Sequence, residues 1–235
     1  MFCPGLVTPQ YDTLAAAYTD WDYSNTTKSD YTWNTPNNIG SNVNARPRYA
    51  LVLICSHRTT ADIYADYVEI GGRVGVPISQ YCYCGLGTNY MMHEAWLVDT
   101  EGLSSNEQVI INFNGDRYGA AWRIFEVVGG IVYDVDNARD VSSASPNTST
   151  ISLLTKAGCP NYITASVFAY TAADMTNQVS NVDDCPSEFG IFGAGNYRFG
   201  VYRAYTQPLD SPHDMTEDHG GSARGTILGV NWIKR

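Results

Sequence analysis

The sequence predicts an all-β, antiparallel fold, a jelly roll or β-sandwich of about eight to ten strands that follows an extended N-terminal arm. Short segments that alternate apolar and polar residues follow one another from residue 48 to the end, separated by Gly, Asn and Pro. No segment has the 3.6-residue apolar period of an amphipathic helix. Hydrophobic residues make up 44% of the 235 residues and aromatic residues 12%, which is enough for a substantial core.

The first 45 residues differ in composition from the rest of the chain. Small polar residues dominate, and only the stretch TLAAAY, residues 13–18, could form a helical turn. Large aromatic residues are spaced among them, although a solvated tail would not need any. We therefore interpret residues 1–45 as an arm that lies over its own domain or over a neighbouring subunit, and both remain open. The arm residues that we expect in contacts between subunits are Tyr11, Tyr18, Trp21, Tyr31 and Trp33.

The remainder, residues 46–235, is expected to form one jelly-roll domain without an internal boundary. The strands are predicted at residues 49–56, 63–70, 79–84, 91–99, 108–112, 120–128, 150–154, 162–171, 197–205 and 225–233. Two polar connections, residues 134–150 and 172–196, are long for a compact domain. Long loops of this kind are the natural place for binding or for contacts with other proteins.

The stretch from Val109 to Gly130 reads as a hairpin around the turn Asn114-Gly115-Asp116. Apolar residues alternate on both sides of this turn, as expected of strands that are half buried. The charged residues of the stretch fit a turn, a solvent face or an interface, without any catalytic role. They are Asp116, Arg117, Arg123 and Glu126.

Charge and hydropathy narrow the possible partners and the location. The chain has 14 Lys and Arg against 24 Asp and Glu, a net charge of −10, and no basic stripe, so nucleic acid is not an expected partner. No apolar run approaches the 18 residues or more of a membrane span, and the start lacks the basic and apolar regions of a signal peptide. We expect a soluble protein made in the host cytoplasm, without contact to a membrane.

The six cysteines do not indicate a metal site. Cys82 and Cys84 would lie on one face of a strand and could present two thiolates, but no second close pair completes a set of four zinc ligands. Buried free thiols are the interpretation that we favour over a disulfide framework. A single bond, for instance between Cys159 and Cys185, could still form outside the cell.

The stretch SPHDMTEDHGG, residues 211–221, is the best metal candidate in the chain. Its candidate ligands are His213, Asp214, Glu217, Asp218 and His219. The histidine spacing fits no helical pair and no second cluster supports it, so we favour a solvated loop and expect no metal and no cofactor. The acidic stretch at residues 134–140 resembles part of a calcium loop, but Arg139 and Ser145 stand where Gly and Glu are required.

No catalytic set can be assembled from the spacing of the residues. There is no G-x-S-x-G, and His57 and His93 fall in or beside predicted strands, where each can be a hydrogen-bonded structural residue. A carboxylate pair for glycoside hydrolysis, Glu94 with Glu126, would require the two strands to be neighbours. We expect no enzyme.

Aromatic residues are the abundant feature with a functional interpretation. The chain has 17 Tyr and 5 Trp, and exposed rings of these types stack on sugars or anchor protein interfaces. They can equally cover a half-buried sheet face. If the protein binds a glycan, the expected contacts are Asp116, Tyr118, Asn196 and Tyr197.

The order of the strand segments resembles a group of small jelly-roll proteins encoded among the structural genes of tailed bacteriophages. The segments that carry the resemblance are RYALVLICSHR, DYVEIGGRVGVPI, MHEAWLVDT, EQVIINFNG, AAWRIFEVVGG and GTILGVNWIKR, within residues 48–235. The resemblance implies a non-enzymatic virion protein, a capsid decoration or cement subunit, in contact with copies of itself and with major capsid or tail proteins. The alternative that it implies is a tail or fibre component that binds a host-surface carbohydrate. The cysteine content and the loop at 172–196 depart from the pattern.

Overall fold

The computed structural model describes residues 21–24, 26–34, 48–58, 64–79, 82–86, 89–104, 106–128, 130–140, 148–156, 161–170, 188–192, 197–206, 213–218 and 224–234. These residues form seventeen β-strands in four sheets, every strand pairing is antiparallel, and the described part of the chain contains no helix. The all-β, antiparallel class predicted from the sequence is therefore confirmed.

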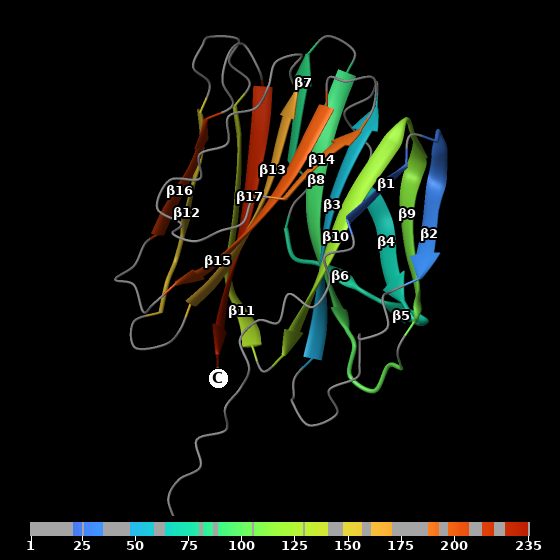
Figure 1. Ribbon diagram of the computed structural model, residues 1–235, viewed down its shortest axis with the longest axis horizontal. Helices are drawn as coiled ribbons and strands as arrows, with labels where there is room; N and C mark the ends of the chain where they lie inside the picture. The colour runs from blue at the N-terminus through green and yellow to red at the C-terminus, as the bar shows by residue number, and fades with distance from the viewer. Residues whose placement is uncertain are drawn as a thin grey trace, which may run out of the picture.

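The four sheets follow one another across the view of Figure 1. The outer sheet, at the right, consists of β2 (Lys28–Asn34), β9 (Gln108–Arg117), β4 (Ala65–Ile70) and β5 (Arg73–Val74). The central sheet consists of β1 (Trp21–Ser24), β10 (Gly119–Val128), β3 (Arg48–Arg58), β8 (Asn89–Asp99), β6 (Val76–Pro77) and β7 (Cys82–Leu86). The C-terminal sheet consists of β11 (Gly130–Asp140), β17 (Arg224–Lys234), β13 (Asn161–Tyr170), β15 (Tyr197–Thr206) and β14 (Glu188–Phe192). The small sheet, at the left, pairs β12 (Thr148–Leu153) with β16 (His213–Asp218).

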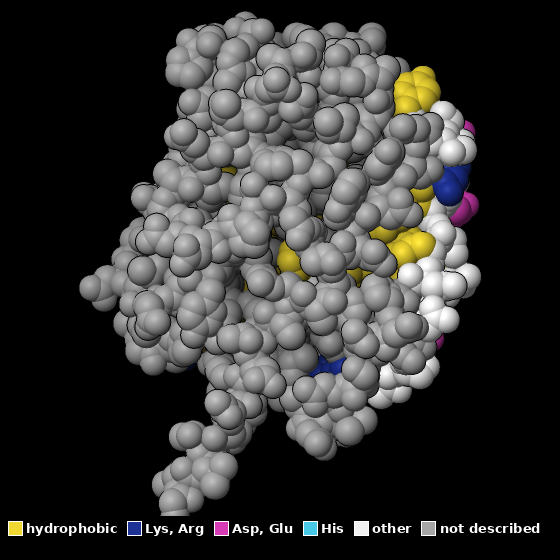
Figure 2. Space-filling view, in the orientation of Figure 1, with side chains coloured by type: hydrophobic (Ala, Val, Ile, Leu, Met, Phe, Trp, Pro, Cys, Tyr) yellow, Lys and Arg dark blue, Asp and Glu magenta, His cyan; other side chains and the backbone are white. Residues whose placement is uncertain are grey.

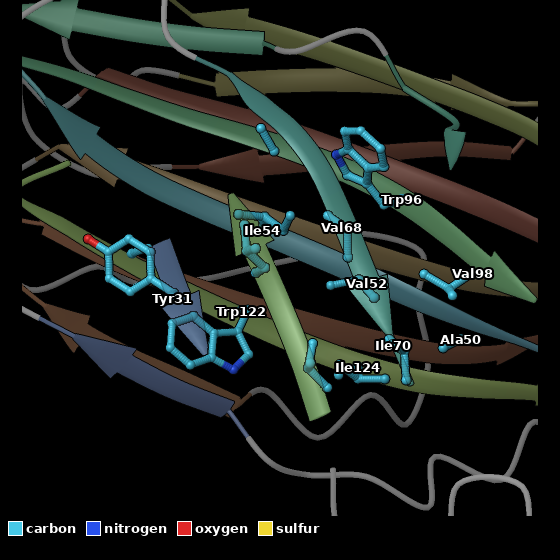
Figure 3. Packing of buried hydrophobic residues seen from close by; sticks show 14 of the residues in the cluster. Tyr31, Ala50, Val52, Ile54, Val68, Ile70, Trp96, Val98, Trp122 and Ile124 are labelled. Atoms are coloured by element: carbon cyan, nitrogen blue, oxygen red, sulfur yellow. The ribbon is translucent and has the colours of Figure 1, made fainter. Parts of the chain in front are cut away.

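A continuous apolar core fills the space between the outer and central sheets. Alternate residues of the facing strands enter it, as expected of strands with one face toward a core. Figure 3 shows the rings of Tyr31 and Trp122 next to each other, one from each sheet, with their centroids 5.9 Å apart. Each large apolar side chain buried in this way contributes about 1.5–3 kcal/mol, so this layer is a main source of stability.

The central sheet is buried on its other face as well. Leu51, Leu53 and Cys55 alternate along β3 with the core residues of the first face, and all three are inaccessible to solvent. Strands β13 and β17 of the C-terminal sheet contact β8 on this side. Burial on both faces explains why residues 50–55 form an unbroken apolar run instead of the alternation of a half-exposed strand.

The small sheet packs closely on the C-terminal sheet at Gly229 of β17. A Cβ atom at this position would lie 2.5 Å from Cδ1 of Ile151 and 2.8 Å from Cδ1 of Leu153, both on β12. Those distances are far below van der Waals contact, so only glycine allows β12 to approach β17 this closely.

Part of the N-terminal segment lies along its own domain. Strand β1 pairs with β10, and β2 pairs with β9. Tyr31, which we expected in contacts between subunits, is fully buried in the core of its own chain. Trp33 packs against the same core, with its ring stacked at 4.1 Å on that of Trp122. The side chain of Trp21 and all of Tyr11 and Tyr18 lie outside the described residues.

Every predicted strand coincides with an observed one, but the structure contains further strands that were predicted as irregular. Residues 134–140 belong to β11 and residues 148–150 to β12, so the prediction of one long connection at 134–150 was wrong. Residues 213–218 form β16 instead of a loop, and residues 188–192, inside the connection predicted at 172–196, form β14. Residues 134–140 and 213–218 escaped prediction because their sequences are polar, and pairing with β17 and β12 supplies the hydrogen bonds that make them strands.

Candidate functional site

Three crossings of the chain between the central and outer sheets lie at one end of the molecule, and two of them carry the candidate site. One crossing leads from β3 to β4, and the other passes directly from β9 to β10 through Tyr118. His57 of β3 pairs with Gly119 of β10, so the two crossings begin side by side. Tyr64, Asn114, Asp116 and Tyr118 are exposed here, and we call these four residues the tyrosine end.

Tyr64 is tied to β9 by a reciprocal pair of hydrogen bonds. Its backbone N–H donates to Oδ1 of Asn114 at 3.2 Å, and the backbone N–H of Asn114 donates to the carbonyl of Tyr64 at 3.1 Å. The following residue, Ala65, is buried in the core. Tyr64 is therefore fixed at its backbone while its side chain is 42% exposed.

Tyr118 is held in a similar way on the other crossing. Its backbone N–H donates to the carbonyl of His57 at 3.0 Å, and its ring lies 5.7 Å from the imidazole ring of His57. The preceding residue, Arg117, is fully buried, whereas Tyr118 itself is 46% exposed. The two tyrosines thus present rings to solvent from fixed backbone positions.

The stretch that contains this site is not the hairpin predicted from the sequence. Residues 114–116 continue β9, and the chain turns only at Tyr118. Strands β9 and β10 then belong to different sheets and do not pair with each other. Burial of Arg117 explains the difference, because its side chain extends the inward alternation of β9 past the expected turn.

Beneath the tyrosine end, Glu94 joins the central sheet to the outer sheet. Its carboxylate is buried and accepts the backbone N–H of Ala65 of β4 at 2.8 Å through Oε1. Its Oε2 atom accepts the indole N–H of Trp96, on the same strand, at 3.0 Å. Both oxygens therefore have donors within the chain, as buried carboxylates require.

Burial raises the pKa of Glu94 to about 7. The hydrogen bonds from Trp96 and Ala65 and the positive charge of Arg117 act in the opposite direction, while Asp66 adds to the rise. Loss of hydration outweighs these partners, because a charged carboxylate is costly in a poorly solvated layer.

Arg117 is a fully buried cation whose charge acts on Glu94 and on Tyr31. Its guanidinium carbon lies 4.6 Å from the centroid of the Phe113 ring, a distance suited to a cation–π contact. Burial raises the pKa of the neighbouring Tyr31 to about 12, against the opposing influence of Arg117. Tyr31 is thus a neutral hydroxyl over the whole physiological range.

His93, the residue before Glu94, enters the opposite face of the central sheet. Its Nδ1 lies 3.0 Å from the hydroxyl oxygen of Thr226 of β17, so this pair connects the central and C-terminal sheets. Burial lowers its pKa to about 3, which keeps the imidazole neutral at physiological pH. His57 is also buried, at the start of the crossing to Tyr64.

The strands that carry the carboxylate pair considered from the sequence, Glu94 and Glu126, are separated by β3. Glu94 pairs with Ile54 and Glu126 with Ala50, so their strands flank β3 on opposite sides and are not neighbours. Four residues along the strand and two strand spacings across put the two Cα atoms about 16 Å apart. Glycoside hydrolysis by a carboxylate pair requires the two groups within about 10 Å.

The structure brings together two of the four residues predicted for glycan binding. Asp116 and Tyr118 lie at the tyrosine end, with Tyr64 and Asn114, which the sequence analysis did not select. Tyr197 begins β15 in the C-terminal sheet, and its side chain, like all of Asn196, lies outside the described residues. The sequence signal for Tyr64 was its place near the start of the strand predicted at residues 63–70.

The metal candidates are distributed along a strand. His213, Asp214, Glu217 and Asp218 lie on β16, and His219 lies outside the described residues. Within the ranges that the structure describes, no three His, Cys, Asp or Glu side chains are grouped as metal ligands. Cys55 is buried, and the backbones of Cys82 and Cys84 lie in β7.

The described part of the chain contains no helix that is long and apolar enough to cross a membrane. No family model, curated protein or solved structure matches the chain.

Proposed function

We propose that the protein is a non-enzymatic structural component of a tailed-bacteriophage virion, namely a capsid decoration or cement subunit. The observation that supports this proposal is that two buried ionisable side chains connect neighbouring sheets. Glu94 and His93 each bond to a neighbouring sheet, so they serve to join the layers of a scaffold. Sheets that are connected by buried hydrogen bonds suit a subunit that must stay folded on a particle outside the cell.

We also propose that the fold is a jelly roll or β-sandwich. The outer and central sheets face each other across one core, which supports a jelly roll or β-sandwich of residues 46–235. In the virion, the subunit would contact copies of itself and major capsid or tail proteins. Of the arm, Tyr11, Tyr18 and Trp21 are the aromatic residues that we propose for these contacts, since Tyr31 and Trp33 pack on their own chain.

Quantitative mass spectrometry of purified particles tests this function. Hundreds of copies per particle would support a decoration subunit, and a handful would support a tail component. Absence from particles would refute a structural role. Deletion of residues 1–20 should release the subunit from particles while leaving a folded β-protein.

A second candidate function is a tail or fibre component that binds a carbohydrate on the host surface. Exposure of Tyr118 beside Asp116 favours it, because a ring and a carboxylate together suit a sugar. Isolated sites of this kind bind on the order of 0.1–1 mM, so many copies would be needed for firm attachment.

A further inference from the structure

We propose that the tyrosine end binds an uncharged oligosaccharide, with Tyr64 and Tyr118 stacking on sugar rings and Asn114 and Asp116 bonding to hydroxyl groups. This inference rests on the second of the two proposed functions and gives it a site and a ligand class.

The two rings are already fixed for binding. Each tyrosine has its backbone hydrogen-bonded to the other crossing or to β9, and each is next in sequence to a core residue, Ala65 or Arg117. Ala65 is in turn bonded to the buried Glu94. A ring that is half exposed on a fixed backbone loses little conformational entropy when a ligand binds.

The charge of the site favours an uncharged ligand. Among the described residues, the tyrosine end has one amide, Asn114, and one carboxylate, Asp116, with Lys28 paired to Arg117 nearby, and the whole chain carries a net charge of −10. An anionic polymer would be repelled by Asp116 and by this overall charge. The hydroxyl groups of a neutral sugar can donate hydrogen bonds to the carboxylate, and they can donate to and accept from the amide.

The size of the site favours a sugar over a protein. Two half-exposed rings fall well short of the roughly 800 Å² per partner of a stable protein interface. At the right edge of the molecule, Figure 2 shows hydrophobic side chains next to side chains of both charges. Asn114, beside Tyr64, precedes Tyr118 by four residues, which is at most about 13 Å of extended strand. The backbone positions that carry the two rings are thus close enough for one oligosaccharide to span them.

Full-length protein displayed on tetrameric streptavidin should be applied to an array of uncharged hexose and N-acetylhexosamine oligosaccharides, with anionic glycans on the same array. We expect binding to at least one uncharged oligosaccharide, and binding about tenfold weaker for Tyr64→Ala and for Tyr118→Ala. Tyr64→Phe and Tyr118→Phe keep the rings and should stay within about twofold of the wild type. Asp116→Ala keeps both rings and should weaken binding about threefold.

Tyr133→Ala is the matched control, because Tyr133 is 41% exposed on β11 of another sheet, and it should bind as the wild type does. Circular dichroism verifies that each variant is folded. The proposal fails if the wild type binds no glycan or only anionic ones, or if both tyrosine variants bind normally. It also fails if Tyr133→Ala loses as much binding as they do. Copy number in particles is independent of these results, so the structural role and the glycan site can fail separately.

Discussion

Two neighbouring residues of β8, His93 and Glu94, enter opposite faces of the central sheet and meet different surroundings. His93 faces the C-terminal sheet and contacts a hydroxyl, that of Thr226. Glu94 faces the outer sheet, with two N–H donors and a nearby arginine. Burial dominates both pKa values, but it lowers that of the histidine and raises that of the glutamic acid, because it disfavours the charged form of each.

The comparison shows that burial of two adjacent residues can make stability depend on pH in opposite senses. The pKa of His93 falls from 6.5 to about 3, so its contribution is complete above pH 6.5 and is lost as the pH falls toward 3. The pKa of Glu94 rises from 4.5 to about 7, so its contribution is complete below pH 4.5 and is lost as the pH rises through 7. Between pH 4.5 and 6.5 the two dependences oppose each other, and we expect stability to change little there.

The largest effect is expected from His93→Leu. A shift from 6.5 to about 3 corresponds to at most about 5 kcal/mol of unfolding free energy lost by the wild type on acidification. The variant should lack this loss, and the difference between variant and wild type should change with pH only between about 3 and 6.5. Urea unfolding across this range measures it. A constant difference would mean that His93 titrates normally in the folded protein.

Glu94→Gln should remove the opposite dependence. The wild type should lose up to about 3 kcal/mol of unfolding free energy between pH 4.5 and 7 through this residue, and the variant should not. Glutamine keeps the size of the side chain but can accept only one of the two N–H donors, so a constant cost is expected at all pH values. Equal pH profiles for variant and wild type would contradict the raised pKa.

Thr226→Val should destabilise the protein by about 1–2 kcal/mol, because it removes the hydroxyl bonded to buried His93 without changing the shape of the side chain. In the double variant with His93→Leu, the cost should largely disappear. Chemical unfolding of the four proteins provides the double-mutant cycle. Additive costs would show that the two side chains do not interact.

The smallest effect on the pH dependence is expected from Trp96→Phe. The hydrogen bond from the indole N–H of Trp96 lowers the pKa of Glu94. Because the substitution removes this bond, the pKa of Glu94 should rise further in the variant. Nuclear magnetic resonance of the glutamate side-chain carbon measures the shift. An unchanged or lower pKa would contradict the role of this hydrogen bond.

The sequence predicted the strands whose side chains alternate, because alternation records one buried and one solvated face. It did not predict β11, whose polar stretch at residues 134–140 resembled a loop, since backbone pairing with β17 leaves no mark in the side chains. The unbroken apolar run at residues 50–55 was visible in the sequence. Its explanation, a strand covered on both faces, depends on where distant sheets pack.

The candidate site was predicted in part. Asp116 and Tyr118 were selected as residues of a hairpin, and both are exposed at the end of β9, although no hairpin forms there. Tyr64 could not be linked to them, because its bond to Asn114 joins residues 50 positions apart in the chain. Glu94 was considered for catalysis, whereas its partner is a backbone N–H of another sheet, which has no signature in the sequence.

The double burial of β3 has a consequence for how the chain can be divided. The outer sheet and the C-terminal sheet each need one face of the same central strands, so neither can be cut away without exposing apolar residues such as Val52 or Leu53 to water. The backbone amides of β3 should therefore be among the last to exchange their hydrogens with the solvent. If the chain were split on either side of β3, one fragment would contain the central strand and the other would lack the apolar face on which its sheet packs.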